Sequence, residues 1–82
     1  MALVRYWAAA REAAGVAEER LAADTLAEAL SAAEAAHGER FARLAAVCSY
    51  LVDGEPAGRR EPAEVTLRED SVVEVLPPFA GG

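Results

Sequence analysis

The sequence predicts an α+β domain in which a mixed sheet of four to five strands packs against one main helix. Short segments rich in valine, leucine and aromatic residues lie near both ends of the chain and have the composition of strands. Between them, apolar residues recur at helical spacing from Leu26 onward. A chain of 82 residues has room for a single core. We therefore expect one domain over residues 1–76 and an extended tail over residues 77–82.

The N-terminal part of the chain is expected to form a strand, a helical turn and a second strand. Leu3–Trp7 alternates apolar and aromatic residues around Arg5, which fits a strand. Ala8–Ala14 can form a helical turn that Gly15 would stop. Glu18–Ala22 is a weaker strand, in which Leu21 is the one large apolar residue.

The main helix is expected to begin after Thr25. Thr25-Leu26-Ala27-Glu28 matches a capping box, in which the threonine oxygen accepts from the Glu28 amide and the glutamate reaches back to the cap. Gly38 occupies the position of a left-handed cap that would end the helix. His37 then lies near the helix C-terminus, where the helix dipole favours a partly charged imidazole, and we expect it to have no side-chain partner.

The segment after the main helix is compatible with either a helix or a loop, and a strand and a turn follow it. Phe41–Val47 fits either a second short helix or a loop, with Phe41 and Leu44 packed on the core. Ser49–Val52 has the composition of a strand. Asp53-Gly54 predicts a hairpin turn, because both residues tolerate positive φ.

The last part of the chain ends in a strand. Pro56 and Pro62 limit regular pairing in the returning segment. Val65–Leu67 fits one more short strand or an extended stretch, and a polar turn follows it. Val72–Leu76 is the final strand, and Pro77-Pro78 stops it.

Alternation along the first and last strands predicts which side chains share a face of the sheet. The residues expected to face the helix are Val4, Tyr6, Val73 and Val75. The residues expected on the opposite face are Arg5, Trp7, Glu74 and Leu76. Exposed apolar side chains mixed with charge are typical of a docking surface.

Charge and composition narrow the class of partner. A net charge of -6 argues against nucleic acid and anionic membranes, so a basic protein partner is the simpler expectation. All eight basic residues are arginines. The chain contains no apolar run of membrane-spanning length and no pattern of a secretory signal, so we expect a cytoplasmic protein.

The sequence lacks a conventional catalytic or metal-binding set. A metal site needs several ligands, and His37 and Cys48 are each the single residue of their type. Cys48 can be a carrier of persulfide sulfur, although a half-buried structural thiol is the more common case. Glu18-Glu19 and Arg59-Arg60 are expected to be solvated surface charges.

The tail offers the one reactive group, the C-terminal carboxylate of Gly82. Pro77-Pro78 stiffens the chain, Phe79 can occupy an apolar pocket, and Ala80-Gly81-Gly82 stays thin enough for a narrow channel. Adenylation would turn this carboxylate into an electrophile that a sulfur nucleophile can attack. The same tail suits a protein modifier joined to lysines, and a non-covalent module with an inert tail is the third alternative.

The residues resemble the MoaD/ThiS family of ubiquitin-like sulfur-carrier proteins, and most closely its MoaD type, the small subunit of molybdopterin synthase. Asp70–Gly82 is similar to the family's C-terminal signature. Tyr6–Glu12 is similar to its aromatic strand followed by alanine and an Arg-Glu pair, and Val52-Asp53-Gly54 to its usual turn.

This resemblance implies a ubiquitin-like β-grasp fold and a carrier that is not itself an enzyme. Gly82 would become an acyl-adenylate and then a thiocarboxylate. The partners would be an adenylating enzyme of the ubiquitin-activating type, a sulfur donor and the large molybdopterin synthase subunit. The carrier would bind no cofactor, and the activating partner would use ATP.

The resemblance also implies which residues contact partners. The docking positions would be Trp7, Leu76 and Arg11, and the inserted residues would be Pro77, Pro78, Phe79, Ala80 and Gly81. Related carriers serve thiamine, cysteine and specialised sulfur metabolites, so the acceptor of the sulfur stays open.

Overall fold

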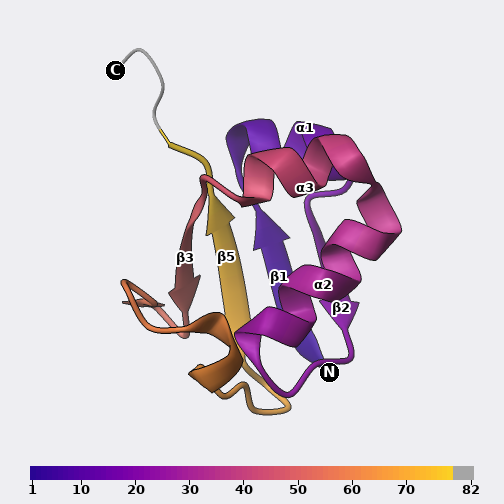
Figure 1. Ribbon diagram of the computed structural model, residues 1–82. Coiled ribbons are helices and arrows are strands. Elements are labelled where there is room, and N and C mark those ends of the chain that lie inside the picture. The colour runs from indigo at the N-terminus through magenta and orange to yellow at the C-terminus, as the bar shows by residue number, and fades with distance from the viewer. Residues whose placement is uncertain (79–82) are drawn as a thin grey trace.

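The computed structural model describes residues 1–78, and the tail residues Phe79–Gly82 lie outside the described part. Within residues 1–78, five strands form one mixed sheet, and helices cover one of its faces (Figure 1). The strands are β1 (Ala2–Tyr6), β2 (Glu18–Leu21), β3 (Ser49–Val52), β4 (Glu55–Pro56) and β5 (Val72–Leu76). The helices are α1 (Ala8–Ala14), α2 (Leu26–His37), α3 (Glu39–Ala45) and the short 3-10 helix η1 (Pro62–Glu64).

The first and last strands lie side by side at the centre of the sheet. The strand order is β2-β1-β5-β3-β4, with β1 and β5 parallel and the other neighbours antiparallel. Tyr6 on β1 and Tyr50 on β3 flank Val75 on β5. Because β1 and β5 run in the same direction, both end at the same edge of the sheet (Figure 1). This arrangement is the ubiquitin-like β-grasp fold that the sequence implied.

The N-terminal elements form as expected, with the boundaries of both strands shifted. β1 spans Ala2–Tyr6 rather than Leu3–Trp7, because the Trp7 carbonyl accepts hydrogen bonds from the amides of Ala10 and Arg11 and so begins α1. β2 ends at Leu21 rather than Ala22, since Leu21 already pairs with Ala2 at the start of β1. Gly15 closes α1 with a left-handed backbone, φ 81°.

The main helix α2 confirms the predicted cap at Thr25. The Thr25 hydroxyl accepts from the Glu28 amide at 3.2 Å. The Glu28 carboxylate accepts from the amide of Asp24 at 2.7 Å, so it reaches the residue before the cap rather than Thr25 itself. Gly38 ends α2 as expected and has a positive φ of 91°, but its ψ of -172° differs from that of the predicted left-handed cap, and α3 follows directly.

The segment after α2, for which a short helix and a loop were both possible, forms a helix. Glu39–Ala45 forms α3 because its residues Phe41 and Ala45 are buried in the core, at 0% and 4% exposure. α2 is the one long helix among residues 1–78, as expected, and the shorter helices α1 and α3 lie beside it.

The returning segment confirms the hairpin turn, and of the two alternatives for Val65–Leu67 it shows an extended stretch rather than a strand. Asp53 and Gly54 have φ of 52° and 83°, which confirms the hairpin turn. Pro56 lies within the edge strand β4, where a missing amide is tolerated. Val65–Leu67 adds no strand to the main sheet, since Thr66 makes only an isolated bridge to Thr25. Val65 and Leu67 are nevertheless buried, and they close the core beside the start of α2.

The two predicted faces of the sheet are confirmed. Val4, Tyr6, Val73 and Val75 are each at most 1% exposed and belong to the core under the helices. The opposite face carries the partly exposed Arg5, Glu74 and Leu76, and Trp7 at its edge is 44% exposed. Within residues 1–78, the structure contains no helix with the length and apolar character needed to cross a membrane.

Candidate docking site at the base of the C-terminal tail

The chain leaves the sheet at its central strand. β5 ends at Leu76, Pro77 is half-buried and Pro78 is exposed. On one side, the Trp7 amide donates to the Val75 carbonyl at 3.2 Å. On the other side, Leu76 pairs with Ser49 at the start of β3. The base of the tail therefore lies between the end of β1 and the beginning of β3.

Trp7 is held at this base by a hydrogen bond across the two central strands. Its indole Nε1 donates to Glu74 Oε1 at 3.0 Å. Glu74 lies opposite Arg5 in the β1–β5 register, but the Arg5 guanidinium donates to Glu18 on β2 at 3.2 Å. The carboxylate of Glu74 is therefore bonded to the indole rather than to the arginine beside it.

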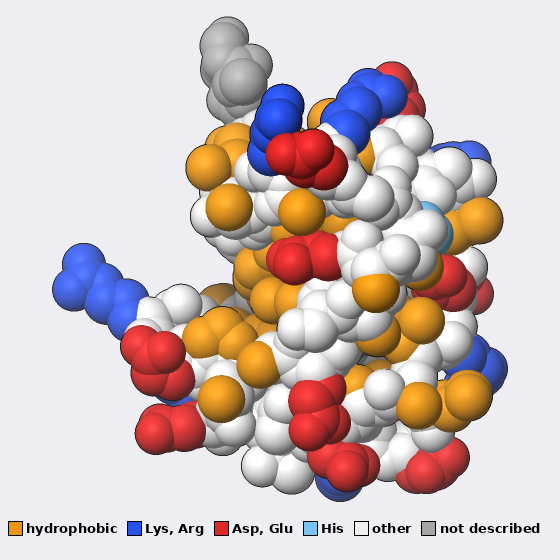
Figure 2. All heavy atoms as spheres, turned by 45° about the vertical axis from the view of Figure 1, so that its right-hand side comes forward, with side chains coloured by type: hydrophobic (Ala, Val, Ile, Leu, Met, Phe, Trp, Pro, Cys, Tyr) orange, Lys and Arg blue, Asp and Glu red, His pale blue; other side chains and the backbone are white. Residues whose placement is uncertain are grey.

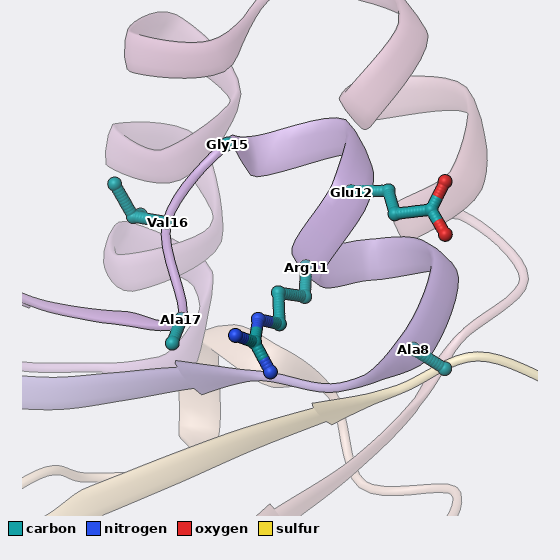
Figure 3. Close-up of a pocket in the computed structure, with 6 residues that line it drawn as sticks. All are labelled: Ala8, Arg11, Glu12, Gly15, Val16 and Ala17. Atoms are coloured by element: carbon teal, nitrogen blue, oxygen red, sulfur yellow. The ribbon is translucent and has the colours of Figure 1, made fainter.

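Arg11 lies one helical turn after Trp7, at the same edge of the sheet. Its backbone amide donates to the Trp7 carbonyl at 3.4 Å. The Arg11 side chain points from α1 toward the end of β1 and Ala17, whereas Glu12 points away (Figure 3). Together with Ala8, Gly15 and Val16, these residues line an open pocket of about 580 Å³. Arg11 is exposed and free to contact a partner at this edge.

Five of the residues that were predicted to bind partners lie within the described part of the chain. Trp7, Leu76, Pro77 and Pro78 lie around the base of the tail, whereas the Arg11 side chain, one turn along α1, points toward Ala17 (Figure 3). Four further predicted residues, Phe79, Ala80, Gly81 and Gly82, lie outside the described residues. Glu74 was placed on this face by strand alternation, but its bond to Trp7 was not foreseen.

His37 is the last residue of α2, as expected, but the expectation that it has no side-chain partner was wrong. Its side chain is 11% exposed, and its Nε2 is hydrogen-bonded to Glu19 Oε2. The Tyr6 hydroxyl donates to the same oxygen, and the rings of Tyr6, His37 and Phe41 pack edge to face. This cluster joins β1, β2, α2 and α3 on the covered side of the sheet.

Glu19 was expected to be solvated, and this was also wrong. It lies two residues before Leu21, and strand alternation turns both side chains toward the helices. That alternation is the sequence signal that could have found it. Partial burial opposes ionisation, but hydrogen bonds from Tyr6 and His37 hold the pKa of Glu19 below its usual value. Burial and the adjacent Glu19 raise the pKa of Tyr6 above its usual value.

The remaining candidates behave as structural or surface groups. Cys48 is half-buried, as expected, and its thiol donates to the Leu44 carbonyl at 3.2 Å. Burial raises the pKa of this thiol, which disfavours the reactive thiolate. Arg60 is exposed, as expected for a surface charge, and its guanidinium donates to the carbonyls of Ala57 and Pro56. Within residues 1–78, no three His, Cys, Asp or Glu side chains gather as metal ligands.

The surface on the helix side carries both signs of charge. Figure 2 shows acidic and arginine side chains interspersed among apolar ones over the visible face. A continuous basic patch is the usual footprint of a protein that binds nucleic acid. The face visible in Figure 2 offers no such patch.

Three solved structures illustrate the similarity of this fold to known proteins. A chain in the BexX/CysO complex of Amycolatopsis orientalis has a TM-score of 0.82 and 20% identity, and the match covers 100% of both chains. Small archaeal modifier protein 1 of Methanosarcina acetivorans has a TM-score of 0.77 and 21% identity, over 99% of this chain and 95% of that chain. A chain in the complex of subunits 1 and 2 of the molybdopterin-converting factor of Helicobacter pylori 26695 has a TM-score of 0.70 and 18% identity, over 99% of this chain and 97% of that chain.

At these identities the likenesses show a shared fold and nothing finer. No curated protein matches the chain significantly. The family model described as the ThiS family matches residues 4–82, which is nearly the whole sequence. The chain therefore belongs to the ThiS family, within the MoaD/ThiS group of ubiquitin-like sulfur-carrier proteins.

Proposed function

We propose that this chain is a sulfur carrier for molybdopterin synthesis, in which the carboxylate of Gly82 is adenylated and then converted into a thiocarboxylate. The observation that carries the proposal is the match of the ThiS family model, which extends through Gly82. The fold supports it, because the central strand β5 runs directly into Pro77 at an edge flanked by Trp7. The chain would be a co-substrate that other proteins charge and discharge.

The proposed chemistry activates the carboxylate before sulfur is added. Within an adenylating enzyme of the ubiquitin-activating type, a Gly82 carboxylate oxygen attacks the α-phosphorus of ATP, and pyrophosphate leaves. A persulfide on the sulfur donor then attacks the acyl carbon, and AMP leaves. A second thiol reduces the resulting acyl disulfide, which leaves the thiocarboxylate on Gly82 and a disulfide on the donor side. ATP is bound by the activating partner, and the carrier itself holds no cofactor.

The proposed partner that uses the thiocarboxylate sulfur is the large subunit of a molybdopterin synthase. The Helicobacter pylori structure supports a protein partner of this kind, since it is a complex of subunits 1 and 2 of the molybdopterin-converting factor. Pro77-Pro78 would restrict the conformations of the inserted tail, and glycines at its end would pass through a narrow channel because they lack a Cβ. Trp7, Leu76 and Arg11 would contact the partner around the base of the tail.

Intact mass measurement tests the proposal directly. The purified chain is incubated with ATP, an adenylating enzyme of this type and a persulfide donor, and we expect its mass to rise by the difference between sulfur and oxygen. A variant with one extra residue after Gly82 is the matched control, because it has the same domain but no carboxylate at Gly82. The proposal fails if the unmodified chain gains no sulfur, or if the extended variant gains it equally.

The acceptor is tested in a second reaction. The thiocarboxylate form is mixed with a large molybdopterin synthase subunit and the pterin precursor, and we expect return to the carboxylate mass with formation of the dithiolene product. Consumption by a thiazole-forming or cysteine-forming enzyme instead would keep the carrier function and overturn the molybdopterin assignment.

A protein modifier is the second candidate, favoured by the fold shared with small archaeal modifier protein 1. In that case Gly82 would be joined to lysines of other proteins. The chain has no lysine, so it could not extend itself through its own side chains. Isopeptide adducts ending in Gly81-Gly82, detected on cellular proteins by mass spectrometry, would support this function.

A further inference from the structure

We propose that Glu74 is a positioning residue that holds the Trp7 indole on the open face of the sheet, where it forms a preorganised contact for the activating partner. The inference rests on the proposed function, because it concerns the docking step that precedes adenylation. It assigns a role to a carboxylate that the chemistry at Gly82 does not use.

Two hydrogen-bond donors, the Arg5 guanidinium and the Trp7 indole, lie near Glu74 in the sheet. Arg5 lies directly opposite it on β1, and a parallel register places these two residues on the same face. Within residues 1–78, however, no arginine forms an ion pair with Glu74. Arg5 is bonded to Glu18 on the far side of β1, and Glu74 Oε1 accepts from the Trp7 indole at 3.0 Å.

The second observation is the exposure of the indole. Trp7 is 44% exposed although it is the largest side chain of the protein, and Leu76 beside it is half-buried. An exposed indole without a polar partner would sample several rotamers. Binding would then have to immobilise it, at a cost of about two- to tenfold in affinity for one large side chain. A bond to a fixed carboxylate on the neighbouring strand removes most of that cost before the partner arrives.

The Arg5–Glu18 ion pair and the Trp7–Glu74 hydrogen bond also indicate which kind of partner surface fits against Trp7. Arg5 and Glu18 neutralise one another, and Glu74 is occupied by a neutral donor. The exposed side of the indole therefore fits an apolar surface on the partner. Aromatic anchors of this kind contribute most when they are rigid and lie at the centre of an interface.

Two variants at position 74 and one matched control test the inference. Glu74→Ala removes the acceptor, and Glu74→Gln keeps an oxygen acceptor without the charge. Glu55→Gln is the control, because it makes the same change of charge on an exposed glutamate of the edge strand β4, far from Arg5 and Trp7 in the strand order. Thermal unfolding by circular dichroism verifies that all three variants are folded.

The first measurement needs no partner. Trp7 is the single tryptophan, so its indole gives one side-chain signal in a ¹H–¹⁵N NMR spectrum. We expect the signal to shift and to exchange faster with water in Glu74→Ala, and to stay close to the original in Glu74→Gln and Glu55→Gln. An unchanged indole signal in Glu74→Ala would overturn the inference.

The second measurement uses sulfur loading by the adenylating enzyme, followed by intact mass. We expect Glu74→Ala to raise KM about two- to tenfold with kcat unchanged, and Glu74→Gln to restore KM to within about twofold. Equal effects of Glu74→Ala and Glu55→Gln would show a simple response to net charge and overturn the inference. If the unmodified chain is loaded and KM of Glu74→Ala does not change, only the inference fails. If the unmodified chain gains no sulfur, the proposed function fails and the docking role of Glu74 fails with it.

Discussion

His37 at the end of α2 is hydrogen-bonded to Glu19 on the edge strand β2. The same Glu19 oxygen accepts from the Tyr6 hydroxyl of β1, so one carboxylate connects the longest helix to two strands. This bond lies on the covered side of the sheet, away from the open face that carries Trp7. It therefore contributes to the stability of the scaffold that presents the tail.

Acid should weaken this connection. Because the pKa of Glu19 is lowered in the folded protein, its contribution is fully present above the unfolded value of about 4.3 and is lost as pH falls through the folded value. We expect Glu19→Gln to lower the free energy of unfolding by about 1 kcal/mol at pH 7, and by less at pH 3. Urea unfolding at both pH values measures the difference. Glu18→Gln is the control, and an equal loss at both pH values would contradict the assignment.

Alkali should destabilise the fold through its two tyrosines. Burial raises the pKa of both Tyr6 and Tyr50, whereas an unfolded tyrosine ionises near pH 10. The folded state then holds more protons than the unfolded state, so stability falls as pH rises above about 10. The chain has no lysines to titrate in the same range.

Substitution of Tyr50 checks this alkaline effect. Tyr50→Phe removes a hydroxyl that donates to the Ala45 carbonyl, so it should lower the unfolding midpoint at pH 8. The deficit should shrink or reverse by about pH 11, because the variant has one tyrosine fewer to ionise on unfolding. Tyrosinate absorbance of the folded wild-type chain appearing near pH 10, as in free tyrosine, would contradict the prediction.

Asp53 should be important for stability because its side chain joins the hairpin turn to β5. Its Oδ1 accepts from the Val72 amide at 2.9 Å and its Oδ2 from the Ser71 hydroxyl at 3.0 Å. Its backbone is left-handed, with φ 52°. Asp53→Ala loses both acceptors and adds backbone strain, so we expect a loss of about 2–3 kcal/mol in chemical unfolding. Asp53→Asn keeps an acceptor and tolerates this φ, and should lose about 1 kcal/mol.

Asp70→Ala is the matched control for this prediction. Asp70 is exposed and lies 3.9 Å from Arg68, so its removal should change stability by less than about 0.5 kcal/mol. Similar losses for Asp53→Ala and Asp70→Ala would show that the turn contacts contribute little.

Of the two glycines that end helices, Gly38 should lose more stability than Gly15 when it is replaced by alanine. Its backbone, φ 91° and ψ -172°, lies in a region used almost exclusively by glycine, whereas Gly15 has φ 81° and ψ 0°. A Cβ at either position meets no atom within 4 Å, so any cost comes from the backbone. We expect Gly38→Ala to lose about 2–3 kcal/mol and Gly15→Ala about 1 kcal/mol, measured by thermal unfolding. A larger loss at Gly15 would contradict this order.

Local sequence signals predicted most of the elements. The capping residue Thr25, the turn Asp53-Gly54 and the stop at Pro77-Pro78 each depend on residues within a few positions, so a sequence pattern is enough to recognise them. The exit of the tail from the last strand was predicted in the same way. The chemistry at Gly82 stays a prediction, because that residue lies outside the described part.

By itself, then, the sequence determined the α+β class, the strand faces, the main helix and the end of the last strand at Leu76. Only the tertiary structure decided that Trp7 leaves β1, that Glu19 is bonded to His37, and that Glu74 accepts from the Trp7 indole rather than from Arg5. Trp7 and Glu74 are 67 positions apart, and their contact depends on the register of two strands that meet only when the domain closes. Patterns of neighbouring residues carry no information about such pairings, which is why the arrangement at the base of the tail had to be read from the structure.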